Sequence, residues 1–132
     1  MNADLRRLEQ DKITENIILG AYKVGNKLGC GFLEKVYENA LAIELAKLDL
    51  QIRQQAALVV KYDGINIGDY YADIMVNQSV LIELKAVKQL NEVHIAQCLN
   101  YLKATNFKVC LLINFGNVFV KDGITRIVNE LI

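Results

Sequence analysis

The segment Val109–Asn114, with the sequence VCLLIN, restricts the fold of this chain more than any other feature. Its first five residues are apolar, so it lacks the alternation of apolar and polar residues seen in a strand with one face in water. A continuous apolar run of this length is typical of a strand covered on both faces. The segment therefore predicts a central strand with other elements packed on each side of its sheet.

Two helical patterns precede the predicted strands. Between residues 12 and 28 apolar residues recur at helical spacing, and Gly29 and Gly31 end the pattern. The second pattern runs from Phe32 to about Leu48, and it places apolar residues on one side. The two patterns predict two helices joined by a tight glycine turn.

The hydrophobic period changes after residue 52. Predicted strands cover residues 52–62, 70–76, 80–87 and 109–114, and a third helix covers residues 92–105. Residues 118–131 predict either a short hairpin or a last helix. The order, roughly ααβββαβ with a mixed central sheet, predicts an α/β sandwich in which helices flank the sheet. Because 53% of the 132 residues are hydrophobic and no linker or repeat is visible, we expect one domain over residues 1–132.

Composition excludes several classes of protein. Fifteen basic and fifteen acidic residues cancel, so any nucleic-acid binding must be local. No apolar stretch reaches the eighteen or so residues needed to span a bilayer, and the start of the chain has no signal-peptide pattern. We therefore expect a cytoplasmic protein that does not bind membranes. The three cysteines lack metal-site spacing, and we interpret each as a reduced, buried thiol.

The segments around Asp73 and Glu83 carry the residues best suited to chemistry. If residues 77–79 form a three-residue hairpin loop, Asp73 lies directly opposite Glu83, with Cβ atoms about 5 Å apart. The alternation of a strand places Glu83 and Lys85 on one face. This pattern predicts two carboxylates and an amine close together.

Two adjacent carboxylates repel and need a compensating cation. Lys85 supplies one positive charge, whereas Mg²⁺ or Mn²⁺ supplies two and suits carboxylate oxygens. Such a site could cleave a phosphodiester, with the lysine activating water or stabilising phosphoryl charge. Alternatively, the same residues form a surface salt-bridge ladder on an edge hairpin, worth under about 1 kcal/mol.

Two further clusters could serve the same site. On the predicted helix 92–105, Gln97 and Tyr101 share a polar arc that could reach a substrate phosphate or Lys85. The alternative is ordinary packing at the edge of the core, as we expect for His94. Glu34 falls in the first turn of the second helix, where it either complements the helix dipole or adds an acidic group to the metal site.

The segment 31–37 (GFLEKVY) fits the pattern that names the GxxExxY protein family, which resembles the PD-(D/E)xK nuclease superfamily. The resemblance runs from about Ile17 to Asn129, and it also includes Asp73, Glu83 to Lys85, Gln97 with Tyr101, residues 111–116 and residues 122–124. Two positions depart from the usual patterns. Ala72 stands where the superfamily has a proline, and Cys30 stands where the family often has one.

The resemblance implies a restriction-endonuclease-like fold and a metal-dependent nuclease. It implies that Asp73 and Glu83 bind Mg²⁺ (or Mn²⁺), with the Leu84 carbonyl as a third ligand and Lys85 as the catalytic lysine. Gln97 and Tyr101 would correspond to the QxxxY helix of the exonuclease-like branch. Glu34 would be the acidic residue of the first core helix, acting in catalysis or on the metal.

Three functions are compatible with these residues. The first is a Mg²⁺-dependent phosphodiesterase acting on DNA as a homodimer that pools two modest basic surfaces. The second is a non-catalytic module that binds nucleic acid or protein through the nuclease fold. The third is a structural subunit of a larger repair or defence assembly.

Overall fold

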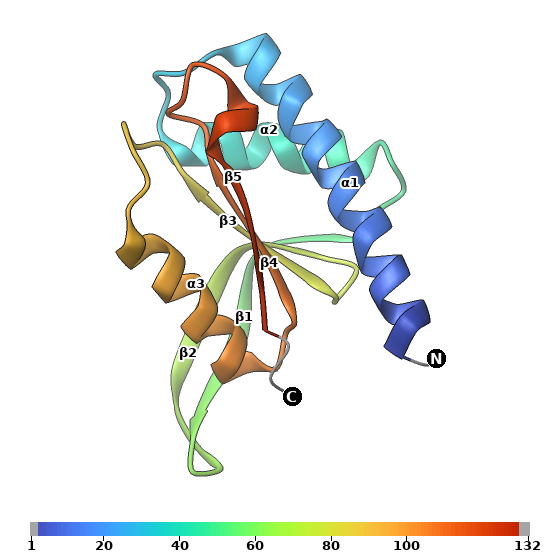
Figure 1. Ribbon diagram of the computed structural model, residues 1–132, viewed down its shortest axis with the longest axis vertical. Helices are drawn as coiled ribbons and strands as arrows, with labels where there is room; N and C mark the ends of the chain where they lie inside the picture. The colour runs from blue at the N-terminus through green and yellow to red at the C-terminus, as the bar shows by residue number, and fades with distance from the viewer. Residues whose placement is uncertain (1–2, 130–132) are drawn as a thin grey trace.

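The computed structural model describes residues 3–129. Its elements follow in the order α1 (Ala3–Leu28), α2 (Glu34–Ala46), β1 (Ile52–Tyr62), β2 (Ile65–Val76), β3 (Val80–Lys85), α3 (Glu92–Thr105), β4 (Val109–Asn114), the 3₁₀ helix η1 (Val120–Gly123) and β5 (Ile124–Val128) (Figure 1). None of the helices within this range has the length and apolar character to cross a membrane.

The strands form one five-stranded mixed sheet in the order β1-β2-β3-β4-β5. Strands β3 and β4 are parallel and are linked by α3, whereas the other neighbours are antiparallel. All six residues of β4 are buried, which confirms the central strand predicted from its apolar run. The outer half of the β1–β2 hairpin extends beyond the rest of the sheet (Figure 1).

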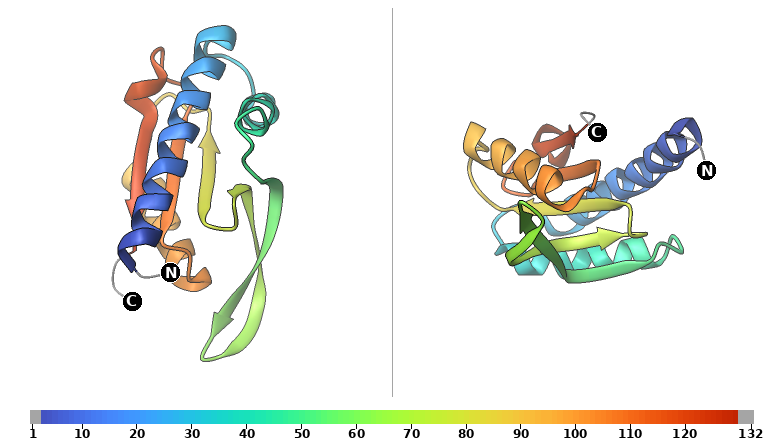
Figure 2. Two further views of the ribbon diagram at one scale, coloured as in Figure 1. Left: turned by 90° about the vertical axis from the view of Figure 1, so that its right-hand side faces the viewer. Right: turned by 90° about the horizontal axis from the view of Figure 1, so that it is seen from below.

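Helices cover both faces of the sheet. Residues of α1 and α2, among them Ile17 and Leu41, pack in one core cluster with Ile82 and Leu84. Residues of α3 pack on the opposite face in a second cluster, which includes Leu81 and Cys110. Figure 2 shows α2 and α3 on opposite sides of the sheet. The predicted α/β sandwich with a mixed central sheet is confirmed.

Strand β2 changes the face that it presents at Asp73. Ala72 packs in the α3-side cluster, whereas Ile74 packs in the cluster beneath α1 and α2. Residues two apart share a face in a regular strand, so the strand is distorted between these positions. On the neighbouring strand Gln55 has a φ of 50°, and it is skipped in the pairing between Gln54↔Ile74 and Ala56↔Ala72. Asp73 therefore lies at the position where the buried side chains of β2 change from the α3 side of the sheet to the side of α1 and α2.

Some element boundaries differ from the sequence prediction. Helix α1 begins at Ala3, whereas the sequence predicted a start near residue 12. The prediction missed the first two turns because they are exposed and show no apolar period. Strand β2 begins at Ile65 rather than Tyr70, within an exposed part of the hairpin. The last segment forms η1 and the strand β5, which pairs with β4, rather than a separate hairpin or an α-helix. Cys98 and Cys110 are buried as expected, but the prediction for Cys30 is wrong because this thiol is exposed.

Candidate active site

The register of the β2–β3 hairpin sets the geometry of the site. Its last pairs before the turn are Ile74↔Ile82, Met75↔Leu81 and Val76↔Val80, which is the predicted register. Asn77 and Gln78 each adopt a φ of 51°, and they complete the tight turn between the strands. Asp73 and Glu83 would form the next pair in this register, but the regular pairing of the two strands ends at Ile74↔Ile82, next to the distortion at Asp73.

Asp73 is held by the protein through both of its carboxylate oxygens. The backbone N–H of Leu84 donates to Oδ2 at 2.8 Å, and the side-chain amide of Gln55 donates to Oδ1 at 3.3 Å. These contacts direct the carboxylate toward α2. Asp73 also lines a hollow of about 470 Å³, the α2 hollow, together with Glu34, Glu38, Gln55 and other residues.

Glu83 packs toward α3, next to Tyr70 and beside the backbone of Asp73. Glu83 is 9% exposed, and the hydroxyl of Tyr70 donates a hydrogen bond to its Oε1. Burial and then the negative charge of Asp73 raise the pKa of Glu83 to about 8, although the Tyr70 hydrogen bond acts in the opposite direction. Glu83 is therefore close enough to Asp73 to sense its charge.

Lys85 shares a face with Glu83, as the alternation of β3 predicts. It pairs with Asn114 at the end of the strand, and its side chain is half-buried. Its positive charge contributes to lowering the pKa of the Cys98 thiol on α3, after the larger effect of a hydrogen bond with Cys110. The ammonium group therefore lies on the α3 side, within reach of the Cys98 thiol.

The carboxylates and the lysine do not form the surface ladder considered above. Among residues 3–129 the ion pairs are Lys35–Glu38, Lys47–Glu44 and Arg126–Asp11, so neither Asp73 nor Glu83 has a basic partner. Strand β3 is also internal, between β2 and β4. The edge-hairpin interpretation is wrong, and two adjacent carboxyl groups have no ion-pair partner within the described chain.

Tyr101 reaches the site through Tyr70, which the sequence analysis did not select. The two rings stack with centroids 3.9 Å apart and an interplanar angle of 22°. Burial, and then the charge of Glu83, raise the pKa of Tyr101. Burial also raises the pKa of Tyr70 well above its usual range. No local pattern indicated Tyr70, because residues three apart lie on opposite faces of a regular strand, and Tyr70 joins the site only through the change of face at Asp73.

Gln97 and His94 contribute less to this arrangement. The Gln97 side chain is exposed and forms no hydrogen bond with residues 3–129. The His94 ring accepts a hydrogen bond from the backbone N–H of Asn91 at 3.3 Å, and Asn91 caps α3 through its own side chain. His94 is thus a helix-capping residue at the edge of the core, as expected.

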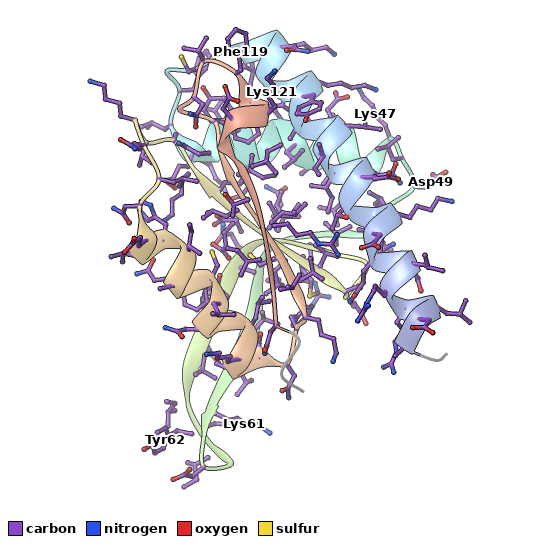
Figure 3. The ribbon with its side chains drawn as sticks, in the orientation of Figure 1. Lys47, Asp49, Lys61, Tyr62, Phe119 and Lys121 are labelled. Carbon is purple, nitrogen blue, oxygen red and sulfur yellow. The ribbon has the colours of Figure 1, made fainter. Side chains whose placement is uncertain are left out.

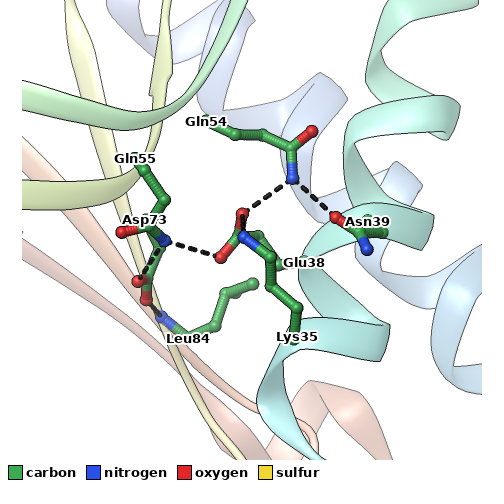
Figure 4. A network of polar contacts seen from close by, with 7 residues as sticks. All are labelled: Lys35, Glu38, Asn39, Gln54, Gln55, Asp73 and Leu84. Carbon is green, nitrogen blue, oxygen red and sulfur yellow. Dashed lines mark hydrogen bonds and ion pairs between the residues drawn. The ribbon is translucent and has the colours of Figure 1, made fainter.

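A buried glutamate on α2 was also missed. Glu34 is the first residue of α2 and is exposed, whereas Glu38, one turn later, is only 3% exposed. Glu38 accepts hydrogen bonds from the side chains of Lys35 (2.9 Å), Gln54 (2.7 Å) and Gln55 (2.8 Å) (Figure 4). Gln55 therefore connects Glu38 with Asp73.

The sequence did contain a signal for Glu38. Glu38, Leu41 and Leu45 follow the i, i+3, i+7 spacing of the buried stripe of α2. A carboxylate within an apolar stripe is unusual, because burying a charge without partners is costly. The glutamine side chains that satisfy it come from β1, and their proximity depends on the tertiary fold.

The tyrosine of the 31–37 motif has a structural role. The Tyr37 hydroxyl donates to the carbonyl of Gly29 at 2.7 Å and accepts from the backbone N–H of Phe32 at 3.2 Å. Its ring stacks on Phe115, with centroids 4.6 Å apart. Gly31 has a φ of 116°, a conformation that favours glycine. Tyr37 and Gly31 thus shape the loop that precedes Glu34 and the α2 hollow.

The oxygen donors of this site suit a hard divalent cation. Among residues 3–129 no three side chains of His, Cys, Asp or Glu gather closely enough to form a metal site on their own. Mg²⁺, however, commonly binds through one or two carboxylates and keeps several waters. Asp73 and Glu83, with the backbone carbonyl of Leu84, could supply such a set. A cation there would lie beside two carboxyl groups that have no ion-pair partner among residues 3–129, and its charge would favour the ionised form of Glu83, whose pKa is raised to about 8.

Comparison with known proteins identifies the family of the chain. The family model of the PD-(D/E)XK nuclease superfamily matches residues 11–127, a range that contains Asp73, Glu83 and Lys85. No curated protein and no solved structure matches the chain significantly. The matched range covers most of the chain and spans the helices on both faces of the mixed sheet. The chain therefore belongs to the PD-(D/E)XK nuclease superfamily.

Proposed function

We propose that this protein is a Mg²⁺-dependent phosphodiesterase, a nuclease that acts on DNA. One observation carries the proposal. Asp73 and Glu83 come directly next to the Ile74↔Ile82 pair of β2 and β3, and neither has an ion-pair partner among residues 3–129. Lys85 follows on the same face as Glu83. Membership of a nuclease superfamily supports the same reaction class.

Asp73, Glu83 and the Leu84 carbonyl would hold the metal, which is Mg²⁺ or Mn²⁺. When bound, the cation would lower the pKa of a water molecule and neutralise charge on the substrate phosphate. The backbone N–H of Leu84 and the Gln55 amide fix the orientation of the Asp73 carboxylate before the cation arrives. Glu38 in turn orients Gln55.

Lys85 is the catalytic lysine of this proposal. Its ammonium forms no ion pair with the described residues, so it is available to a phosphate oxygen. It would stabilise the negative charge that develops on the phosphoryl oxygens, or activate the attacking water. Tyr101, Gln97 and Glu34 complete the proposed site, with Glu34 placed at the α2 hollow beside Asp73.

DNA is the proposed polymer, and residues 1–132 are proposed to form one nuclease-like domain. Because the chain has no net charge, its phosphate contacts must come from local clusters of basic residues. A homodimer would place two such clusters on one DNA molecule.

The substitution Lys85→Ala tests the proposed reaction. Purified protein should cut labelled single-stranded or duplex DNA with Mg²⁺ or Mn²⁺, and Lys85→Ala should lose at least about 100-fold in rate. Lys61→Ala is the matched control, because Figure 3 shows Lys61 at the tip of the β1–β2 hairpin, away from the site. No cleavage of DNA or RNA under either metal would reject the proposal.

A non-catalytic binding module is the second candidate function. It is favoured by the state of Glu83, which is largely buried and bonded to Tyr70. In this function the buried Glu83 does not bind a metal ion, and the fold serves only to bind nucleic acid or protein. Equal binding of nucleic acid with and without EDTA, without strand breakage, would favour this candidate over the nuclease.

A further inference from the structure

A second hollow lies at the other end of the sheet from the carboxylates. It has a volume of about 700 Å³ and is formed by the first turns of α1, the β2–β3 turn, the α3–β4 connection and the end of β5. Figure 2 shows the start of α1 beside this end of the sheet. We call it the basic hollow, after its lining residues Arg6, Arg7, Lys108 and Arg126.

The basic hollow concentrates positive charge in a chain whose net charge is zero. Asp11 is the one acidic side chain among its described lining residues, and it is paired with Arg126 at 2.6 Å. Arg6, Arg7 and Lys108 are exposed and form no ion pair with residues 3–129. Three cations without an ion-pair partner among residues 3–129 therefore face one concave surface, where their mutual repulsion favours an anionic ligand.

We propose that the basic hollow binds the phosphate groups of a nucleotide, a polyphosphate or a nucleic-acid backbone. Guanidinium groups bind phosphate through two parallel hydrogen bonds, and a lysine adds a point charge. The volume is within the range of about 300–1,000 Å³ typical of small-ligand sites. The half-buried ring of Phe107 also lines it and offers an apolar surface to a base.

This site is separate from the proposed nuclease centre. Strand β3 begins at Val80, beside the basic hollow, and ends at Lys85. Five residues of strand span about 17 Å, so one phosphate cannot contact Lys85 and the basic hollow together. Binding in the basic hollow therefore does not depend on cleavage or on a metal, and each proposal can fail without the other.

Calorimetric titration in EDTA tests the inference on the full chain. The probes are sodium tripolyphosphate, for a free ligand, and a short oligothymidylate, for a nucleic-acid backbone. At low ionic strength the wild type should bind at least one of them. The triple variant Arg6→Gln/Arg7→Gln/Lys108→Gln should bind it at least about tenfold more weakly, because it lacks the charge-assisted hydrogen bonds.

Two further variants distinguish loss of the basic hollow from a general loss of positive charge and from misfolding. The variant Lys23→Gln/Lys27→Gln/Lys61→Gln has the same change in charge on exposed residues outside the basic hollow, and it should bind like the wild type. Asp11→Asn removes the ion pair of Arg126 and should tighten binding, a gain that misfolding cannot produce. Binding of neither probe by the wild type, or equal binding by the two triple variants, would overturn the inference.

Discussion

The ionisation of Glu83 depends strongly on its surroundings. Burial and the charge of Asp73 raise its pKa from 4.5 to about 8, so the folded chain binds more protons than the unfolded chain between these pH values. The contribution of Glu83 to the free energy of unfolding must therefore decrease as pH rises through this window. This sign is opposite to that of a carboxylate stabilised by a salt bridge.

The variant Glu83→Gln should remove this pH dependence. The glutamine is neutral throughout, so its stability relative to wild type should increase from pH 5 to pH 8, the window set by the two pKa values. Urea unfolding of both proteins across the window measures the difference. If the two curves run parallel, Glu83 does not titrate as its environment indicates.

Glu38 and Glu34 differ in what their removal should cost. Glu38→Ala leaves Gln54, Gln55 and Lys35 without their shared acceptor, and we expect a loss of about 1–2 kcal/mol in the free energy of unfolding. Glu34→Ala removes an exposed side chain and should change stability by less than about 0.5 kcal/mol. Chemical denaturation measures both. A larger loss for Glu34→Ala would contradict the role given to Glu38.

At the scale of elements, the β1–β2 pair is distorted at Gln55. The φ of 50° at Gln55 is unfavourable for a residue with a Cβ and accessible to glycine. Gln55→Gly and Gln55→Ala both remove the hydrogen bonds to Glu38 and Asp73. The glycine variant should nevertheless be more stable than the alanine variant by about 1 kcal/mol. Equal stability, measured by urea unfolding, would mean that the backbone at Gln55 relaxes without cost.

The sequence predicted those elements whose signals are local. Helix α3 and strand β4 have the predicted bounds, because a helical period and an apolar run mark them directly. The hairpin register followed from the length of its turn. Strand β5 has only five residues and forms by pairing with β4. No local sequence pattern predicts this pairing.

The parts of the candidate site that depend on local patterns were also predictable from the sequence. The register that brings Asp73 and Glu83 next to the Ile74↔Ile82 pair, and the shared face of Glu83 and Lys85, follow from turn length and alternation. The change of face at Asp73 did not, because it depends on the distortion at Gln55 on another strand. Tyr70 and Glu38 were missed for a similar reason, since their partners come from other elements.

At the scale of the whole molecule, opposite charges gather at opposite ends of the sheet. The carboxylates of the proposed nuclease site lie toward the end of β3, and the basic hollow lies at its start. A net charge of zero thus combines a group of carboxyl side chains at one end with a group of basic side chains at the other. Such a distribution is compatible with binding a cation at one end and phosphate at the other.

Calorimetric titration with Mn²⁺ tests the central claim most directly, since it needs no assumption about the substrate. We predict that the wild type binds Mn²⁺ and that Asp73→Asn does not. Asp63→Asn, at the exposed turn between β1 and β2, should bind like the wild type. No binding by the wild type, or equal binding by all three proteins, would contradict a metal site between Asp73 and Glu83.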